Sequence, residues 1–189
     1  MSIQTRRERE RAERERLIVT AARELAESEG WDAVTTRRLA AEIEYSQPVL
    51  YSHFKGKDAI MAAVAVEGFA DLAAELREAR DGARPAHELA AVAAAYTGFA
   101  ERRPALYDAM FTRSVDLPFA SPEAPRALHA GFGELREALR PIAGDDDLDL
   151  LTETFWSGLH GLVTLTRAGR LPPERRDARL AVLVGRFSA

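Results

Sequence analysis

Apolar residues recur at intervals of three and four along almost the whole chain, and the alternation with period two that half-buried strands need is missing. Glycine and proline are sparse, with 12 and 9 among 189 residues, and they gather in short breaks such as DGARP, PIAGDD and AGRLPP. This pattern predicts an all-α fold in which the breaks separate helices. We expect the longer helices from the N-terminal arm to Glu29 and at about 57–80, 86–101, 104–111, 123–140, 147–168 and 173–187.

The segment TTRRLAAEIEYSQPVLYSHFKGKD, residues 35–58, predicts two short helices joined by a tight turn. Thr35 can cap the first of them and Ser46 the second. Pro48 falls in the first turn of the second helix, where its missing N–H does no harm. A long helix then starts at Lys57. Together with the preceding helix, whose buried stripe we expect to include Leu17, these elements make a helix-turn-helix unit.

Composition limits where the chain works and what it can bind. It contains no cysteine, which excludes disulfides and thiolate metal sites and favours a cytoplasmic location. The first 16 residues are charged where a signal peptide needs an apolar core, and no run of 18 apolar residues exists to span a membrane.

Charge is distributed unevenly along the chain. The formal net charge is −4, but residues 1–58 are balanced, so the acidity lies in the later part. The N-terminal arm, residues 1–14, belongs to a stretch that alternates Arg and Glu at spacings that allow i,i+4 pairs. It reads equally well as a solvated extension of the first helix and as an arm that touches DNA.

A helix-turn-helix unit places its last helix in the major groove and anchors the flanking chain on phosphates. Gln47 can pair with a base edge, and Pro48 and Val49 can pack on a thymine methyl group. Hydroxyl, imidazole, amine and guanidinium donors at the helix ends suit phosphate oxygens. The predicted DNA-binding residues are Thr36, Arg37, Gln47, Pro48, Val49, Tyr51, Ser52, His53 and Lys57. Tyr51 could also belong to a small packed core, where we expect Phe54.

The stretch VTTRRLAAEIEYSQPVLYSHFKGKDAI resembles the helix-turn-helix signature of the TetR family of transcriptional repressors, over roughly residues 15–62. The matching positions are Thr35, Leu39, Ala40, Ser46, Leu50, Tyr51, His53, Phe54 and Lys57. The resemblance implies that Thr36, Arg37, Tyr51, His53 and Lys57 meet phosphates. It also implies that Gln47, Pro48 and Val49 lie against the bases.

The turn between the two short helices departs from the family pattern. The family has glycine in a turn such as A-G-V-S, whereas this chain has Ile43-Glu44-Tyr45-Ser46. A glutamate held at positive φ costs about 1 kcal/mol relative to glycine. We therefore expect a slightly re-shaped turn.

The stretch TFWSGLHGLVTLTRAGRL resembles the W-x-x-x-H-G stretch of one subgroup of TetR C-terminal domains, in a helix that helps to form the dimer. Its apolar face and that of the last helix suit a four-helix, two-fold interface, and the two-fold axis matches a palindromic operator. Gly158 and Gly161 leave room for a close helix. The predicted interface residues are Leu151, Leu159, Leu162, Val163, Leu180, Leu183, Val184 and Phe187. The alternative is that both helices close the core of a single chain.

Aromatic and soft side chains gather in the segments that the resemblance places around one cavity. A pocket lined by aromatic side chains with a few polar groups suits a mid-sized, largely apolar effector. These segments hold no cluster of Lys or Arg side chains, so an anionic effector is not favoured. The candidate pocket residues are Tyr96, Phe99, Tyr107, Met110, Phe111, Phe155, Trp156 and His160. Ordinary core is the competing interpretation for each, and His160 could be a core histidine with one hydrogen bond.

Catalytic and metal-binding patterns are missing from the sequence. The acidic run 145–149 lacks the glycine and glutamate of an EF-hand loop and suits a helix N-terminus instead. His87 and His129 belong to no HExxH pair, and there is no nucleophile elbow or glycine-rich phosphate loop. We expect no enzyme activity, no cofactor and no metal.

These observations predict two domains. Residues 1–60 would bind DNA through the helix-turn-helix unit, and residues 61–189 would bind an effector and dimerise. The predicted function is a ligand-responsive DNA-binding regulator, a repressor that leaves its double-stranded DNA operator when a small-molecule effector binds the homodimer. The alternative is a helical protein-interaction module that no longer reads DNA.

Overall fold

The computed structural model describes residues 3–115, 117–118 and 121–188, and all regular elements there are helices. This confirms the all-α fold. The α-helices are α1 (Ile3–Glu29), α2 (Thr36–Glu42), α3 (Gln47–His53), α4 (Lys57–Asp81), α5 (Glu88–Arg102), α6 (Pro104–Phe111), α7 (Arg126–Leu139), α8 (Leu148–Arg167) and α9 (Arg176–Phe187). Two 3₁₀ turns, η1 (Arg140–Ile142) and η2 (Pro173–Arg175), precede α8 and α9.

Local sequence signals set the helix ends. Gly30, at φ 85°, ends α1, and the Thr35 hydroxyl accepts a hydrogen bond from the Arg38 N–H at 3.2 Å to start α2. The Asp147 carboxylate caps α8, at 3.0 Å from the Asp149 N–H. This is the role that its place at a helix N-terminus predicted for the acidic run.

The turn between α2 and α3 is closed by two backbone hydrogen bonds. The Tyr45 N–H donates to the Ala40 carbonyl at 2.8 Å, and the Glu44 N–H donates to the Ala41 carbonyl at 3.3 Å. This pair of bonds is the Schellman motif, which requires a left-handed residue after the helix. Glu44 fills that place at φ 57°. The expected re-shaping of the turn is therefore not found: Glu44 takes the positive φ that glycine would take, and the turn is a regular helix stop.

The chain divides into two compact units. The first unit holds the described residues up to Gly68 together with those of Arg103–Ala124, so it contains α1 to α3, the start of α4, and α6. The second holds Phe69–Arg102 and the described residues from Pro125 onward. The chain crosses between them within α4, between α5 and α6, and before α7.

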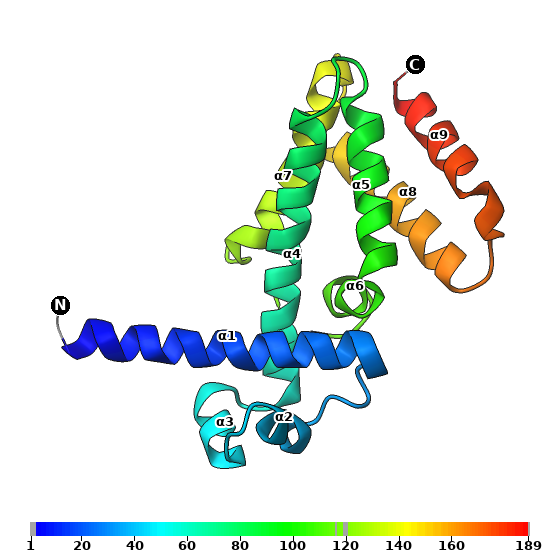
Figure 1. The fold of residues 1–189 in the computed structure, drawn as a ribbon. Coiled ribbons are helices and arrows are strands. Elements are labelled where there is room, and N and C mark those ends of the chain that lie inside the picture. The colour runs from blue at the N-terminus through cyan, green and yellow to red at the C-terminus, as the bar shows by residue number, and fades with distance from the viewer. Residues whose placement is uncertain (1–2, 116, 119–120, 189) are drawn as a thin grey trace. The chain divides into compact units, whose positions relative to one another are not determined.

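In the first unit, α1 is the longest element, and α2 and α3 lie along one side of it (Figure 1). The apolar side chains of α1 are buried from Ile18 onward, and Leu39 of α2 and Leu50 of α3 are fully buried too. The prediction for Leu17 is wrong, because its side chain is 43% exposed. Leu17 is about 100° away from Ile18 around the helix, on the solvent side.

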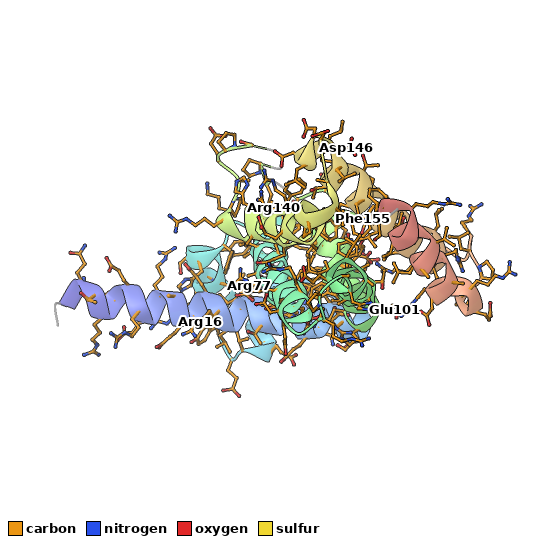
Figure 2. All side chains as sticks on the ribbon, turned by 90° about the horizontal axis from the view of Figure 1, so that it is seen from above. Arg16, Arg77, Glu101, Arg140, Asp146 and Phe155 are labelled. Carbon is orange, nitrogen blue, oxygen red and sulfur yellow. The ribbon has the colours of Figure 1, made fainter. Side chains whose placement is uncertain are left out.

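In the second unit, large side chains of α5 and α8 fill the core. Tyr96, Phe99 and Phe155 are buried, and the Phe155 ring lies 5.0 Å from that of Phe187 on α9. Figure 2 labels Phe155 on α8. A Cβ added to Gly158 would come within 2.9 Å of Leu183, so α9 of the same chain uses the room that this glycine leaves.

A buried carboxylate joins α7 to the second half of α4. Glu134 is almost fully buried, and its Oε1 accepts a hydrogen bond from the Arg77 Nε at 2.8 Å. The Arg80 Nη2 lies 3.0 Å from the other carboxylate oxygen. Two guanidinium groups therefore balance the one buried negative charge.

Candidate nucleic-acid interface

Helix α3 has one fully buried apolar side chain and a broad outward surface. Leu50 is fully buried and holds the seven-residue helix to the unit. Gln47, Pro48, Val49, Tyr51 and Ser52 are all exposed. We call this set the α3 surface. Val49 is exposed, and the Tyr51 side chain is 52% exposed. Exposed apolar side chains on so short a helix indicate a surface that binds a partner, not a packed core.

Polar groups from the start of α2 lie beside the α3 surface. The Thr36 and Tyr51 hydroxyl groups are 3.3 Å apart, at hydrogen-bonding distance. Arg37 is exposed, and it makes no ion pair or hydrogen bond within the described residues. The structure thus brings Thr36, Arg37 and Tyr51 together, with a cationic group available for an anion.

His53 and Lys57, the remaining predicted phosphate donors, and Ser52 of the predicted DNA-binding set already have partners in the chain. The His53 Nδ1 lies 3.3 Å from the Glu15 carboxylate, and its side chain is only 6% exposed. The Lys57 ammonium group donates to the Trp31 carbonyl, and the Ser52 hydroxyl donates to the Val49 carbonyl at 2.6 Å. Lys57 has two further N–H donors, so this bond does not prevent a contact with phosphate.

The N-terminal arm is the first part of α1, which begins at Ile3; residues 1 and 2 lie outside the described part. Arg6 pairs with Glu10, and Arg11 pairs with Glu15, each at 2.8 Å and four residues apart. Charged pairs at this spacing stabilise a helix in water. The Arg11 Nη2 also reaches the Ser52 carbonyl at 3.5 Å, so the arm touches the end of α3.

Helix α6 is fastened to α1 by polar groups far away in the sequence. The Glu27 carboxylate accepts hydrogen bonds from the backbone N–H groups of Ala105 at 3.1 Å and Leu106 at 2.9 Å. It thereby caps the N-terminus of α6, where negative charge is favoured. The Trp31 indole N–H donates to the Ala105 carbonyl at 2.7 Å. We call Glu27 and Trp31 the α6 clamp.

Sequence reasoning missed Arg11, Glu15 and the α6 clamp. Stepping back from Ile18 by turns of the helix would have found Arg11, because it continues the buried face. Glu27 gives no such signal, because its partners are backbone groups 78 and 79 residues later.

The candidate effector residues fall in both units. Tyr107, Met110 and Phe111 belong to α6 in the first, where the Tyr107 and Phe111 rings are 4.7 Å apart. In the second unit, the Trp156 indole N–H donates to the Tyr96 hydroxyl at 3.0 Å.

The exposure of the candidate effector residues also differs. Tyr96, Phe99, Tyr107, Met110 and Phe155 are buried, whereas Phe111, Trp156 and His160 are half-buried. The Trp156 and His160 rings are 6.2 Å apart, and burial lowers the pKa of His160. The half-buried side chains are therefore the ones with surface left for a ligand.

A small hollow lies among α5, α8 and α9. It has room of about 30 Å³ and is lined by Thr97, Glu101, Leu162, Val163, Thr166, Arg167, Arg176 and Leu180. Arg176 and Glu101 form an ion pair at this place. The hollow would hold about one water molecule, which makes it too small for a mid-sized effector.

The candidate dimer residues of α8 and α9 divide by burial. Leu159 and Val163 are buried inside the unit, which is the alternative that the sequence left open for them. The other six, Leu151, Leu162, Leu180, Leu183, Val184 and Phe187, are partly exposed. More exposed apolar side chains accompany them, among them Leu165 and Val182, the latter 63% exposed.

Metal and membrane features are missing from the residues that the structure describes. Those residues contain no group of three His, Cys, Asp or Glu side chains that could hold a metal ion. None of the described helices is both long and apolar enough to cross a membrane.

The fold and the α3 surface define a helical protein with a DNA-binding helix-turn-helix unit, and comparisons agree. Residues 18–64 match the family described as "Bacterial regulatory proteins, tetR family". Residues 89–187, just over half of the chain, match "Tetracyclin repressor-like, C-terminal domain". The chain belongs to the TetR family of DNA-binding transcriptional regulators.

Individual proteins match this chain over different parts of its length. The HTH-type transcriptional regulator Rv0681 of Mycobacterium tuberculosis is 28% identical over 173 residues, which cover 91% of this chain and 78% of that protein. The tetracycline repressor class D of Escherichia coli is 46% identical over 50 residues, covering 26% of this chain and 23% of the repressor. A solved structure of a Rhodococcus protein of unknown function superimposes with a TM-score of 0.77 at 25% identity, covering 92% of this chain and 93% of the other.

Proposed function

We propose that this TetR-family chain is a homodimeric repressor that binds a palindromic operator and is released from it by a small, largely apolar effector. The observation that carries the proposal is the α3 surface. A seven-residue helix with Leu50 as its one fully buried apolar side chain presents five exposed side chains, next to an Arg37 that has no partner in the described part of the chain. Such a surface combines groups for base edges with a cation for phosphate.

The roles within the interface follow from side-chain chemistry. Gln47 pairs with a base edge, and Pro48 and Val49 pack against thymine methyl groups. Arg37 and the Thr36–Tyr51 hydroxyl pair bind phosphate oxygens, which fixes the register of α3 in the groove. In this proposal Ser52, His53 and Lys57 complete the phosphate contacts at the end of α3 and the start of α4.

Dimerisation through α8 and α9 supplies the second recognition helix. The partly exposed apolar side chains of these helices, with Leu165 and Val182, offer a surface that a second copy can cover. An interface that uses the same patch on both chains has a two-fold axis, and a two-fold protein fits a palindromic site.

The effector acts by linkage. It must bind better to a form in which the two α3 helices are mis-spaced than to the form that fits the operator, and such coupling is typically about 1 to 3 kcal/mol. Helix α6 can carry the signal, because it follows α5 directly and the α6 clamp bonds it to α1.

The polar tips of Trp156, Tyr96 and His160 would orient a largely apolar ligand. With Gly161, Trp156 and His160 also support placing the chain in the W-x-x-x-H-G subgroup. The same proposal includes a cytoplasmic site of action, where operator DNA is available, and no enzyme activity.

The decisive experiment is a fluorescence-anisotropy titration against the DNA upstream of the chain's own gene, across a salt series and beside a scrambled duplex. We expect palindrome-dependent binding with a steep salt slope. Gln47→Ala should reduce the preference for the operator, whereas Arg37→Gln should weaken binding to both duplexes. If a genome-wide selection also yields no specific fragment, the DNA-reading proposal fails and the protein-interaction alternative replaces it.

The effector part has its own test. Trp156→Ala should blunt release by a ligand found in a screen while operator affinity stays nearly unchanged. Phe99→Ala should have the same effect if Phe99 lines the pocket, and Val92→Ala, at a fully buried position of α5 outside the candidate pocket, is the comparison for core damage. Equal loss of operator binding and release in Trp156→Ala would assign Trp156 to the core and contradict the pocket.

A further inference from the structure

The first half of α1 is more helix than the fold of its unit needs. Apolar side chains of α1 are buried only from Ile18 onward, yet the helix begins at Ile3. Figure 1 shows this N-terminal part continuing past α3, and in Figure 2 its side chains, Arg16 among them, stand away from the helix on all sides. The stretch is a preformed, highly charged rod, and packing against a core does not explain it.

The face of α1 that is buried in its second half continues as an arginine stripe in its first half. At about 3.6 residues per turn, one side of the helix carries both sets. In order along the chain, this side carries Arg7, Arg11, Arg14, Ile18, Ala22 and Leu25. The last three are buried, whereas the three arginines are exposed. The stripe therefore points to the side of α1 on which its unit lies.

Two contacts fix where the stripe meets the rest of the interface. Arg11 reaches the Ser52 carbonyl on α3 at 3.5 Å, and the Glu15 carboxylate lies 3.3 Å from the His53 Nδ1. Both partners are at the C-terminal end of α3. The stripe is thus continuous with the proposed DNA-binding surface.

The charge of the stripe is available to a partner. Arg7 and Arg14 make no hydrogen bond or ion pair within the described residues. Glu10 pairs with Arg6, and Glu15 pairs with Arg11. The charges of Arg14 and Arg7 also act on Glu10, but more weakly than its hydrogen-bonded partner Arg6. Glu8 borders the same face and reduces the positive charge there without cancelling it.

We infer that Arg7 and Arg14 bind phosphates of the DNA duplex just outside the stretch that α3 reads, so that α1 is a second, helical contact with DNA. This rests on the proposed DNA-binding function. Guanidinium groups bind phosphate oxygens through paired N–H donors, and a preformed helix holds them in place. The part of α1 before Arg11 spans roughly 12 Å, which adds about 3 to 4 base pairs beyond each α3 contact.

The test compares two double variants of the full chain with equal loss of charge. Arg7→Gln with Arg14→Gln removes the two unpaired charges of the stripe, whereas Arg6→Gln with Arg16→Gln removes two charges that lie outside it. Arg16 is on the opposite side of α1, and Arg6 is about 100° from Arg7 around the helix. Operator binding is measured by anisotropy across a salt series, and the protected base pairs by hydroxyl-radical footprinting. Far-ultraviolet circular dichroism and thermal unfolding check that both variants fold alike.

We expect the stripe variant to bind at least about tenfold more weakly at 0.1 M salt and to lose the flanking protection. The salt slope should fall by about 3.6, because the dimer loses two arginines from each of its two chains. The control variant should retain the wild-type footprint and most of the slope. Equal weakening by both pairs would reduce the effect to net charge and overturn the inference. A wild-type footprint in the stripe variant would also overturn the inference. In that case, specific binding by the wild type would still support the proposed function. A wild type without any specific DNA site would overturn both.

Discussion

The two units are held together by different means. In the first, the short helices α2, α3 and α6 pack against α1 through few buried side chains, and single polar contacts add to them at helix ends, such as those of the α6 clamp and of Lys57 with the Trp31 carbonyl. In the second, longer helices pack along their length around aromatic side chains, and Glu134 supplies a buried charge cluster. One substitution can therefore change the orientation of a helix in the first unit, whereas the stability of the second unit is distributed over many contacts.

The largest effect is expected at the α6 clamp. Glu27→Ala removes the acceptor of two backbone N–H groups, and we expect a loss of about 2 to 3 kcal/mol in the free energy of unfolding. Thermal and urea unfolding measure it. Glu24→Ala is the matched control one turn earlier, since Glu24 is exposed and its carboxylate has no partner among the described residues. Equal shifts in the two variants would show that the cap contributes nothing.

A smaller loss is expected at the charged cluster of the second unit. Glu134→Gln keeps the size of the side chain but leaves Arg77 and Arg80 without their shared negative charge, which should cost about 2 kcal/mol. Glu137→Gln is the control, because its ion pair with Arg140 is exposed and solvent screens it, so that its loss should change the unfolding temperature little. If Glu134→Gln unfolds at the wild-type temperature, the second unit does not depend on its buried carboxylate.

The parts of the fold that the sequence predicted correctly are those that depend on neighbouring residues. The ends of α1, α2 and α4 were predicted correctly, because glycine, capping threonine and apolar spacing act within a few residues. The exposure of Val49 and Ser52 on α3 agrees with their prediction as DNA-facing residues, whereas Leu50 is buried. Leu17 was misplaced because neighbours on a helix point about 100° apart, and the buried face is narrow.

Long-range contacts were out of reach of the sequence. The grouping of α6 with α1 includes hydrogen bonds from backbone N–H groups of α6 to Glu27. Because almost every residue has a backbone N–H group, no pattern of side chains predicts this contact. The candidate pocket residues face the same obstacle. A buried Tyr96 and a half-buried Trp156 have similar local sequence surroundings, and only the packing of α5 against α8 distinguishes them.

A stabilising change is expected in the turn of the first unit. Glu44 sits at φ 57°, so Glu44→Gly should relieve about 1 kcal/mol of backbone strain and raise the unfolding temperature by about 2 to 4 °C. Glu44→Ala keeps a Cβ at the same φ and should give no such gain. A rise in both variants would mean that loss of the carboxylate, not relief of the backbone, stabilises the turn.

The smallest effect, in the second unit, depends on pH. Burial lowers the pKa of His160 in the fold below its unfolded value of about 6.5, so protonation favours the unfolded chain. The stability from neutral His160 is therefore present above about pH 6.5 and is lost as the pH falls through the lower folded pKa. Between pH 7.5 and 5.5 the wild type should lose more thermal stability than His160→Gln, whereas His129→Gln, at an exposed position on α7, should follow the wild type. Parallel curves for the wild type and His160→Gln would mean that His160 can take up a proton without cost, as a histidine open to solvent would. A divergence confined to His160→Gln would place an acid-sensitive group beside Trp156, the candidate effector residue whose ring lies 6.2 Å away.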